Sequence, residues 1–139
     1  MITFLTDNVP MPPLNVPKTI KWMQLVAANY GFVVGNLNYI FCDDDKILQV
    51  NQEFLQHDYY TDVITFDYST STVLSGDVFI SLDTVRSNAQ MVADTFEREL
   101  DRILIHALLH LTGQGDKTPE TKQVMTQKED QALELRNQL

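Results

Sequence analysis

The chain has 139 residues and one cysteine, so its length fits a single domain and it cannot form an internal disulfide. Its formal net charge of −9, with only ten Lys and Arg residues, argues against tight nonspecific binding to nucleic acid and leaves a local basic patch open. No run approaches the ~18 apolar residues of a membrane span, and the N-terminal segment lacks a signal-peptide pattern. We therefore expect one cytoplasmic domain, residues 1–139, with no membrane partner.

The first part of the chain combines strand-like and helix-like patterns. The apolar segments 1–6 and 37–42 are predicted to be strands, the second of them buried. Between them we predict a helix over 16–30, because Asn15 suits the N-cap position and Gly31 suits the position just past the end.

A run of three aspartates, Asp43–Asp45, marks the start of the next predicted helix. Carboxylates suit a helix N-terminus, where backbone N–H groups lack partners and the helix dipole is positive. We prefer this cap to a calcium site, because the spaced oxygen ligands and the glycine of a calcium loop are missing. The helix is expected to extend to about Leu55 and to bury a stripe formed by Ile47, Val50 and Phe54.

The second half of the chain is predicted to contain two strands followed by three helices. The strands 63–68 and 77–82 are expected to pair across the polar segment 69–72. The helices are predicted in three segments: from Ser81 or Asp83 to about Ala93, from about Phe96 to Thr112, and from Thr118 to the end. This order predicts an α+β fold, with about five helices packed on a small mixed sheet of four strands.

The segment 105–116, Ile-His-Ala-Leu-Leu-His-Leu-Thr-Gly-Gln-Gly-Asp, carries two of the three histidines. His106 and His110 are four residues apart, which places their Cβ atoms roughly 5–6 Å apart on one helix face. Gly113 suits the end of this helix and allows the chain to bring Asp116 back to the same point. Two imidazoles and a carboxylate leave a fourth tetrahedral position for water, as in catalytic zinc sites. We predict that these three residues bind one Zn²⁺.

A helical wheel places both histidines at the flank of the apolar face, beside Glu99 and Arg102. An ion bound there would lie at the edge of the buried stripe and stay accessible to solvent, as on a zincin-like metal helix. The alternative is that both histidines are surface residues that touch the edge of the core. The carboxylate beyond the helix end favours the metal site.

Three motifs together resemble the YbeY endoribonuclease family. The run H-A-L-L-H-L-T-G-Q-G-D is similar to the family's H-G-x-L-H-L-x-G-Y-D-H, with Asp116 where the family usually has its third metal-binding histidine. Segment 48–66 is similar to the family's L-N-x-x-Y-R-x-K-D-x-P-T-D-V-L-S-F, and segment 75–81 to its L-G-D-I-x-I-S. Because Asp is a competent zinc ligand, we expect the site to be retained. The alternative is that His57 completes the ligand set.

The resemblance also implies catalytic positions. Leu55 stands where the family has an arginine implicated in RNA cleavage, and His57 stands at the position of a lysine. An arginine near a phosphodiester stabilises developing charge by roughly several kcal/mol. Either protonated His57 substitutes, or the nuclease is weaker, or another arginine reaches the site; the candidates are Arg86, Arg98 and Arg102. We predict catalytic roles for His57, Arg102 and Asp62, the last of which is expected to line the cleft.

By this resemblance the chain is expected to be a zinc-dependent, single-strand-specific endoribonuclease of ribosomal RNA processing and ribosome quality control. Metal-activated water would attack a phosphodiester. The implied partners are ribosomal RNA, the small ribosomal subunit and the GTPase Era. Two alternatives stay open: a ribosome-associated binding module with a structural metal and little nuclease activity, or a metallopeptidase. The peptidase is disfavoured because Ala107 replaces the glutamate that serves as its general base.

Overall fold

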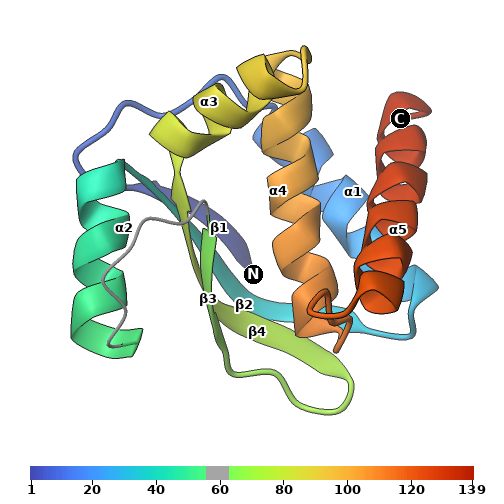
Figure 1. Ribbon diagram of the computed structural model, residues 1–139. Helices are drawn as coiled ribbons and strands as arrows, with labels where there is room; N and C mark the ends of the chain where they lie inside the picture. The colour runs from blue at the N-terminus through green and yellow to red at the C-terminus, as the bar shows by residue number, and fades with distance from the viewer. Residues whose placement is uncertain (56–62) are drawn as a thin grey trace.

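The computed structural model describes residues 1–55 and 63–139, and a sheet of four strands lies at its centre (Figure 1). The strands lie in the order β1 (Ile2–Thr6), β2 (Val33–Cys42), β4 (Val73–Ser81) and β3 (Val63–Asp67). β2 runs parallel to both β1 and β4, whereas β3 pairs antiparallel with β4. The predicted mixed sheet of an α+β fold is confirmed.

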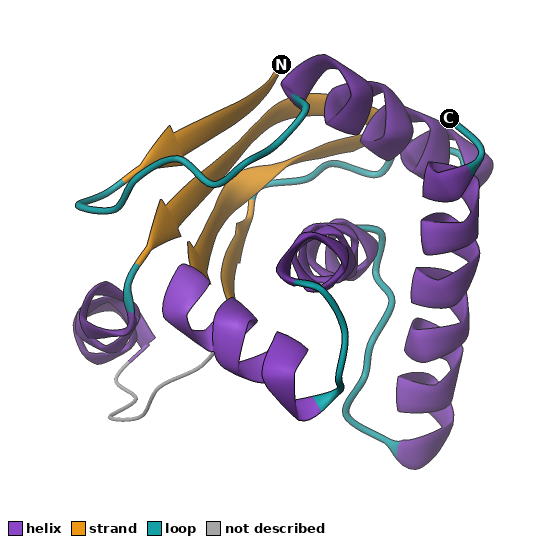
Figure 2. Ribbon diagram, turned by 90° about the horizontal axis from the view of Figure 1, so that it is seen from above, coloured by secondary structure: helices purple, strands orange, loops and turns teal. Residues whose placement is uncertain are grey.

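Five α-helices accompany the sheet in the described ranges: α1 (Val16–Asn29), α2 (Asp44–Val50), α3 (Leu82–Met91), α4 (Phe96–Leu111) and α5 (Pro119–Asn137). α1, α3 and α4 share the main core with one face of the sheet, and α5 packs on α1 and α4 (Figure 2). α2 packs on the opposite face, where it contacts side chains that alternate with those of the main core. In the described part of the chain, no helix has both the length and the apolar character needed to cross a bilayer.

Helix α4 lies between the sheet and α5 and contributes much of the core (Figure 2). Two buried hydrogen bonds tie the neighbouring elements together. The Tyr39 hydroxyl of β2 donates to the carbonyl oxygen of Leu104 in α4 at 2.9 Å. The indole N–H of Trp22 in α1 donates to the carbonyl oxygen of Ala132 in α5 at 2.7 Å. Both bonds satisfy the polar atom of a large buried aromatic side chain, so the helix that carries the histidines sits in a well-packed layer.

The predicted helix starts are confirmed by their capping hydrogen bonds. The side chain of Asn15 accepts from the backbone N–H of Lys18, and that of Asp43 accepts from the backbone N–H of Lys46. The acidic triplet therefore begins helix α2, as predicted. The start of β4 was less predictable: it begins at Val73 rather than at residue 77, because Val73 pairs with Val33 of β2 across the sheet.

Phe54 is the clear exception to the predicted apolar stripe of the second helix. Ile47 and Val50 are buried as expected, but Phe54 is 64% exposed. After Val50 the helix continues as a wider π-helical turn, η1 (Asn51–Leu55). A π-helix follows an i→i+5 hydrogen-bond pattern, so the α-helical spacing that predicts the stripe does not apply to Phe54. The Phe54 ring instead meets the ring of Phe66 edge-on, with 5.9 Å between centroids.

Candidate metal centre

The turn after helix α4 brings Asp116 back to the helix. The backbone N–H of Gln114 donates to the carbonyl of Leu109, and that of Gly113 donates to the carbonyl of His110. This pair of bonds is a Schellman motif, and it needs a residue in the left-handed region just past the helix end. Gly113 supplies it with φ +99°. The chain reversal expected from the glycine is therefore present.

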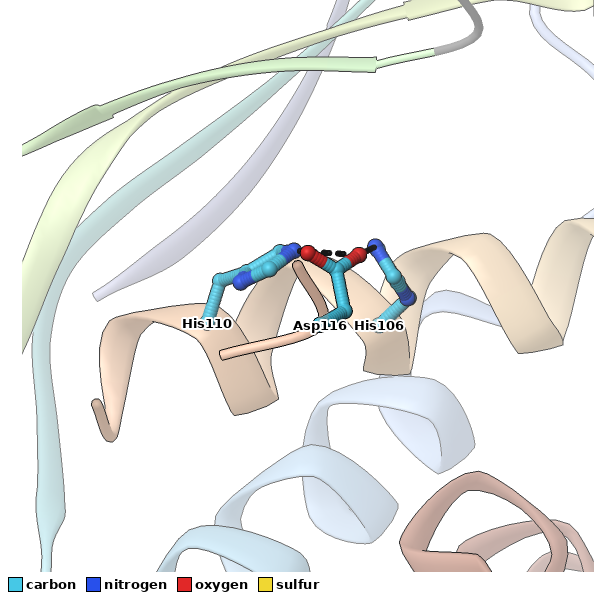
Figure 3. A group of neighbouring side chains, drawn as sticks. All are labelled: His106, His110 and Asp116. Atoms are coloured by element: carbon cyan, nitrogen blue, oxygen red, sulfur yellow. Dashed lines mark ion pairs between the residues drawn. The ribbon is translucent and has the colours of Figure 1, made fainter. Parts of the chain in front are cut away.

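The side chains of His106, His110 and Asp116 meet beside the helix (Figure 3). Asp116 Oδ2 lies 3.5 Å from His106 Nε2 and 3.4 Å from His110 Nε2. One candidate ligand atom from each residue falls within 4.8 Å of the other two. All three residues are partly buried, so the cluster lies at the rim of the core and not inside it. The wheel predicted this position, and ion binding by the three residues stays a prediction.

The outer nitrogens of both imidazoles are engaged in hydrogen bonds. His110 Nδ1 lies 2.9 Å from the carbonyl oxygen of Gln114, which can only accept, so Nδ1 carries the hydrogen. His106 Nδ1 lies 2.6 Å from Oε2 of Glu129, which accepts when ionised. In the neutral rings, the lone pairs are then on the two Nε2 atoms, and both face the carboxylate of Asp116. Three facing electron-pair donors repel one another unless a cation or extra protons lie between them.

This donor set fits a divalent metal ion. Two imidazole nitrogens and one carboxylate oxygen form a common catalytic zinc set. The hydrogen bonds to Glu129 and to the carbonyl of Gln114 are the outer contacts that metal-binding histidines usually make. The side chains therefore have both the inner atoms and the outer partners that a metal ion requires.

Arg102, predicted to be catalytic, lines a pocket of about 220 Å³ together with His106 and Asp116. Its guanidinium contacts Glu129 Oε1 at 2.9 Å and Asp130 Oδ1 at 2.8 Å. Burial lowers the pKa of Arg102, but the hydrogen bonds to these two carboxylates outweigh burial and raise that pKa. The positive charge of Arg102 is thus next to the candidate metal centre, but it is already paired with the carboxylates of Glu129 and Asp130. Its catalytic role stays a prediction.

The other predicted catalytic residues, His57 and Asp62, lie outside the described residues, so their roles and the alternative ligand His57 stay predictions. Arg86 pairs with Asp83 within α3, and Arg98 pairs with Asp94 just before the start of α4; neither arginine lines this pocket. Ala107 is fully buried, so the position where zinc peptidases carry their glutamate points into the core.

Two residues of the pocket escaped the sequence analysis. Lys122 lies on α5 at the pocket wall and has no ion-pair partner in the described ranges. Glu129, also on α5, contacts His106. Neither has a sequence signal that ties it to the histidines, because the return path of the chain through residues 113–118 decides where α5 lies.

The fold and the site define an α+β protein with a candidate metal centre on a core helix and just beyond its end. The family sequence model described as Endoribonuclease YbeY matches residues 13–137. The chain is 53% identical over 135 residues to a Phocaeicola vulgatus protein named endoribonuclease YbeY, with 97% of this chain and 98% of that protein covered. The chain therefore belongs to the YbeY endoribonuclease family. The resemblance inferred from the three motifs is confirmed.

Two further comparisons agree with this assignment. A Bacteroides thetaiotaomicron protein, also named endoribonuclease YbeY, is 49% identical over 135 residues, and 97% of this chain and 98% of that protein are covered. The solution structure of a Thermotoga maritima protein superimposes with a TM-score of 0.70 at 26% identity, covering 98% of this chain and 89% of that one. The structural match extends over nearly the full length, beyond the residues matched by the family sequence model.

Proposed function

We propose that this chain is a metal-dependent endoribonuclease that hydrolyses phosphodiester bonds in single-stranded RNA at the centre formed by His106, His110 and Asp116. The observation that carries the proposal is the direction of the two Nε2 atoms, which face one carboxylate at 3.5 and 3.4 Å. Family membership supplies the reaction class, since the relatives are named endoribonucleases.

Zn²⁺ is the ion we propose for this site, because two imidazoles and one carboxylate suit it. When bound, such an ion acts as a Lewis acid that lowers the pKa of water and polarises a phosphoryl oxygen. His106, His110 and Asp116 would hold it. Asp116 stands where the resemblance places a histidine, so this ligand set carries one more negative charge than the usual one. A more negative set weakens the Lewis acidity of the ion, and we expect water activation to shift to higher pH.

Lys122 is the cation that we propose for contact with an RNA phosphate. It lines the pocket next to His106 and Asp116, and it is exposed and unpaired among residues 1–55 and 63–139. Arg102 is less suited, because both of its terminal nitrogens already bind carboxylates. A lysine ammonium binds phosphate as a point charge, so Lys122 can attract the substrate without the forked geometry of an arginine.

In the cell we propose a role in ribosomal RNA processing and ribosome quality control, with the small ribosomal subunit and the GTPase Era as partners. The net charge of −9 supports selective contacts over general RNA affinity. The engagement of Arg102 by two acids favours one alternative, a ribosome-binding module with a structural metal. Cosedimentation of the purified chain with small ribosomal subunits tests the association. A variant that has lost only RNA cleavage should still cosediment with them.

The test of the enzyme is cleavage of a labelled single-stranded RNA and of its duplex. We expect cleavage of the single strand that a chelator abolishes and added Zn²⁺ restores, together with loss of activity and of bound zinc in Asp116→Ala. The matched control is Asp45→Ala, which removes an exposed carboxylate of α2 and should leave both unchanged. Cleavage that survives the chelator, or that persists in Asp116→Ala, would overturn the proposal. Full zinc binding without any cleavage would support the binding module.

A further inference from the structure

Glu129 is the one acidic residue in the buried class among residues 1–55 and 63–139, with 7% of its surface exposed. A buried carboxylate costs free energy unless charged or polar partners compensate it. Glu129 projects from α5 toward α4, and its partners both come from α4: Arg102 and His106, which are four residues apart on one face of that helix.

The two carboxylate oxygens of Glu129 have separate partners. Oε2 lies 2.6 Å from His106 Nδ1, and Oε1 accepts from Arg102 Nη1 at 2.9 Å. Arg102 Nη2 in turn donates to Asp130 at 2.8 Å. The contacts form one chain that runs from Asp130 through Arg102 and Glu129 to His106. It ends at Nδ1 of the ring, whereas Nε2 of the same ring faces the candidate metal centre.

We infer that Glu129 is a positioning residue, which holds His106 in the tautomer and orientation that the metal centre needs, and that Arg102 holds Glu129. The ring of a histidine can rotate about its side-chain bond and can carry its hydrogen on either nitrogen. An acceptor at Nδ1 keeps the hydrogen there and leaves the Nε2 lone pair aimed at Asp116. Arg102, which the sequence marked as a catalytic candidate, acts in this arrangement through Glu129.

The second histidine provides an internal contrast. His110 Nδ1 contacts the main-chain carbonyl of Gln114 at 2.9 Å, so no side-chain substitution removes its acceptor. We therefore expect the orientation of His106 to depend on the Glu129 side chain of α5, whereas the orientation of His110 depends on the backbone of the turn after α4. This difference makes Glu129 the more sensitive position for substitution.

The decisive variant is Glu129→Gln. Glutamine keeps the shape of glutamate but offers one acceptor and one donor, whereas Arg102 and His106 are both donors. One of the two partners is then left without an acceptor. The inference rests on the metal binding of the proposed function, but it does not rest on RNA cleavage, so its measurements are the zinc affinity and the histidine tautomer.

We expect Glu129→Gln to weaken zinc binding by roughly 10–100-fold, measured by competition with a chromophoric chelator. Arg102→Met should weaken it in the same direction by less, and the double variant should lose less than the product of the two single effects. In the metal-free protein, nitrogen NMR of the rings should show hydrogen on Nδ1 of His106 in the wild type and a mixture of tautomers in Glu129→Gln, with His110 unchanged.

The matched control is Asp101→Asn. Asp101 of α4 pairs with Arg136 of α5 at 3.5 Å, so it joins the same two helices through the same kind of contact at a distance from the histidines. We expect this variant to leave zinc affinity unchanged. The inference is overturned if Glu129→Gln behaves like the control, with unchanged zinc affinity and an unchanged tautomer. If zinc binds the wild type and no RNA is cleaved, the enzyme proposal fails while this measurement still decides the role of Glu129.

Discussion

The carbonyl oxygen of Gln114 accepts a hydrogen bond from His110 Nδ1 at 2.9 Å, while the backbone N–H of the same Gln114 closes the end of helix α4 on Leu109. The turn that stops the helix thus also orients one of the candidate ligands. Two residues further on, the same turn delivers Asp116. The same turn therefore both ends the helix and places two of the candidate ligands, so we expect substitutions in the turn to affect metal binding.

Gly113→Ala is expected to impair both stability and metal binding. Gly113 has φ +99°, and a side chain in the left-handed region costs roughly 1–2 kcal/mol. Relief of this strain would move Gln114 and Asp116, so zinc affinity should fall together with the melting temperature. Gly115→Ala is the control, because no atom lies within 4 Å of its added Cβ and its φ is not positive. Equal behaviour of the two variants would contradict the role of the turn.

Gly76→Ala should destabilise the sheet beneath helix α4. A Cβ at this position would lie 2.4 Å from the carbonyl oxygen of Phe66 on the neighbouring strand, so β3 and β4 would have to separate. We expect a loss of about 1–3 kcal/mol in the free energy of unfolding, measured by urea denaturation. The added methyl would also lie 3.6 Å from Leu111 at the end of α4. An unfolding free energy equal to that of the wild type would show that the strand pairing tolerates the methyl group.

Lys122→Ala is expected to reduce RNA affinity without changing zinc affinity. Removal of one phosphate contact should raise KM, leave kcat nearly unchanged and lower the slope of affinity against salt by roughly one. The control is Lys128→Ala on the same helix, since the ammonium group of Lys128 lies 4.7 Å from the ring centroid of Tyr30 and away from the pocket. If both variants bind RNA like the wild type, Lys122 does not contact the phosphate.

The stability of the protein should decline in alkaline solution through Cys42. Burial, together with the nearby Asp43 and Asp7, raises the pKa of this thiol from 9.0 to about 12, although Lys46 partly opposes the shift. The unfolded chain then releases the thiol proton at lower pH than the folded chain does, so this contribution to stability is complete below pH 9.0 and is lost as the pH rises toward about 12.

Urea denaturation of the wild type and of Cys42→Ala at a series of pH values measures this contribution. We expect the variant to be less stable at neutral pH, because it leaves a cavity in the core, and to lose less stability as the solution becomes alkaline. Parallel pH profiles for the two proteins would assign the alkaline loss to other groups. In the folded wild type, the thiol should also react slowly with a thiol reagent, since the thiolate is the reactive form.

Much of the candidate site follows from local rules. The four-residue spacing of His106 and His110 places both on one face of any helix, and Gly113 permits the reversal that returns Asp116. The caps at Asn15 and Asp43 are equally local, because the bonded groups are three residues apart. Such features depend on atoms within one turn of the chain, which the sequence alone specifies.

Other features depend on which faces pack together. Phe54 is exposed and lies in η1, where the α-helical spacing behind the predicted stripe no longer applies. Strand β4 lies between β2 and β3, and its pairing with β2 starts both strands earlier than the predicted segments 37–42 and 77–82. No pattern within either segment specifies this partner, since the pairing forms between residues far apart in the chain.

The sequence by itself determined the α+β class and the local geometry of the two histidines and the carboxylate after them, because backbone period and end capping are properties of short segments. Only the tertiary structure decided that Glu129 reaches His106, that Arg102 is occupied by acids, and that Lys122 lies at the pocket wall. These contacts exist because α5 packs against α4 after an intervening turn, and the burial of apolar faces sets how two helices lie against each other.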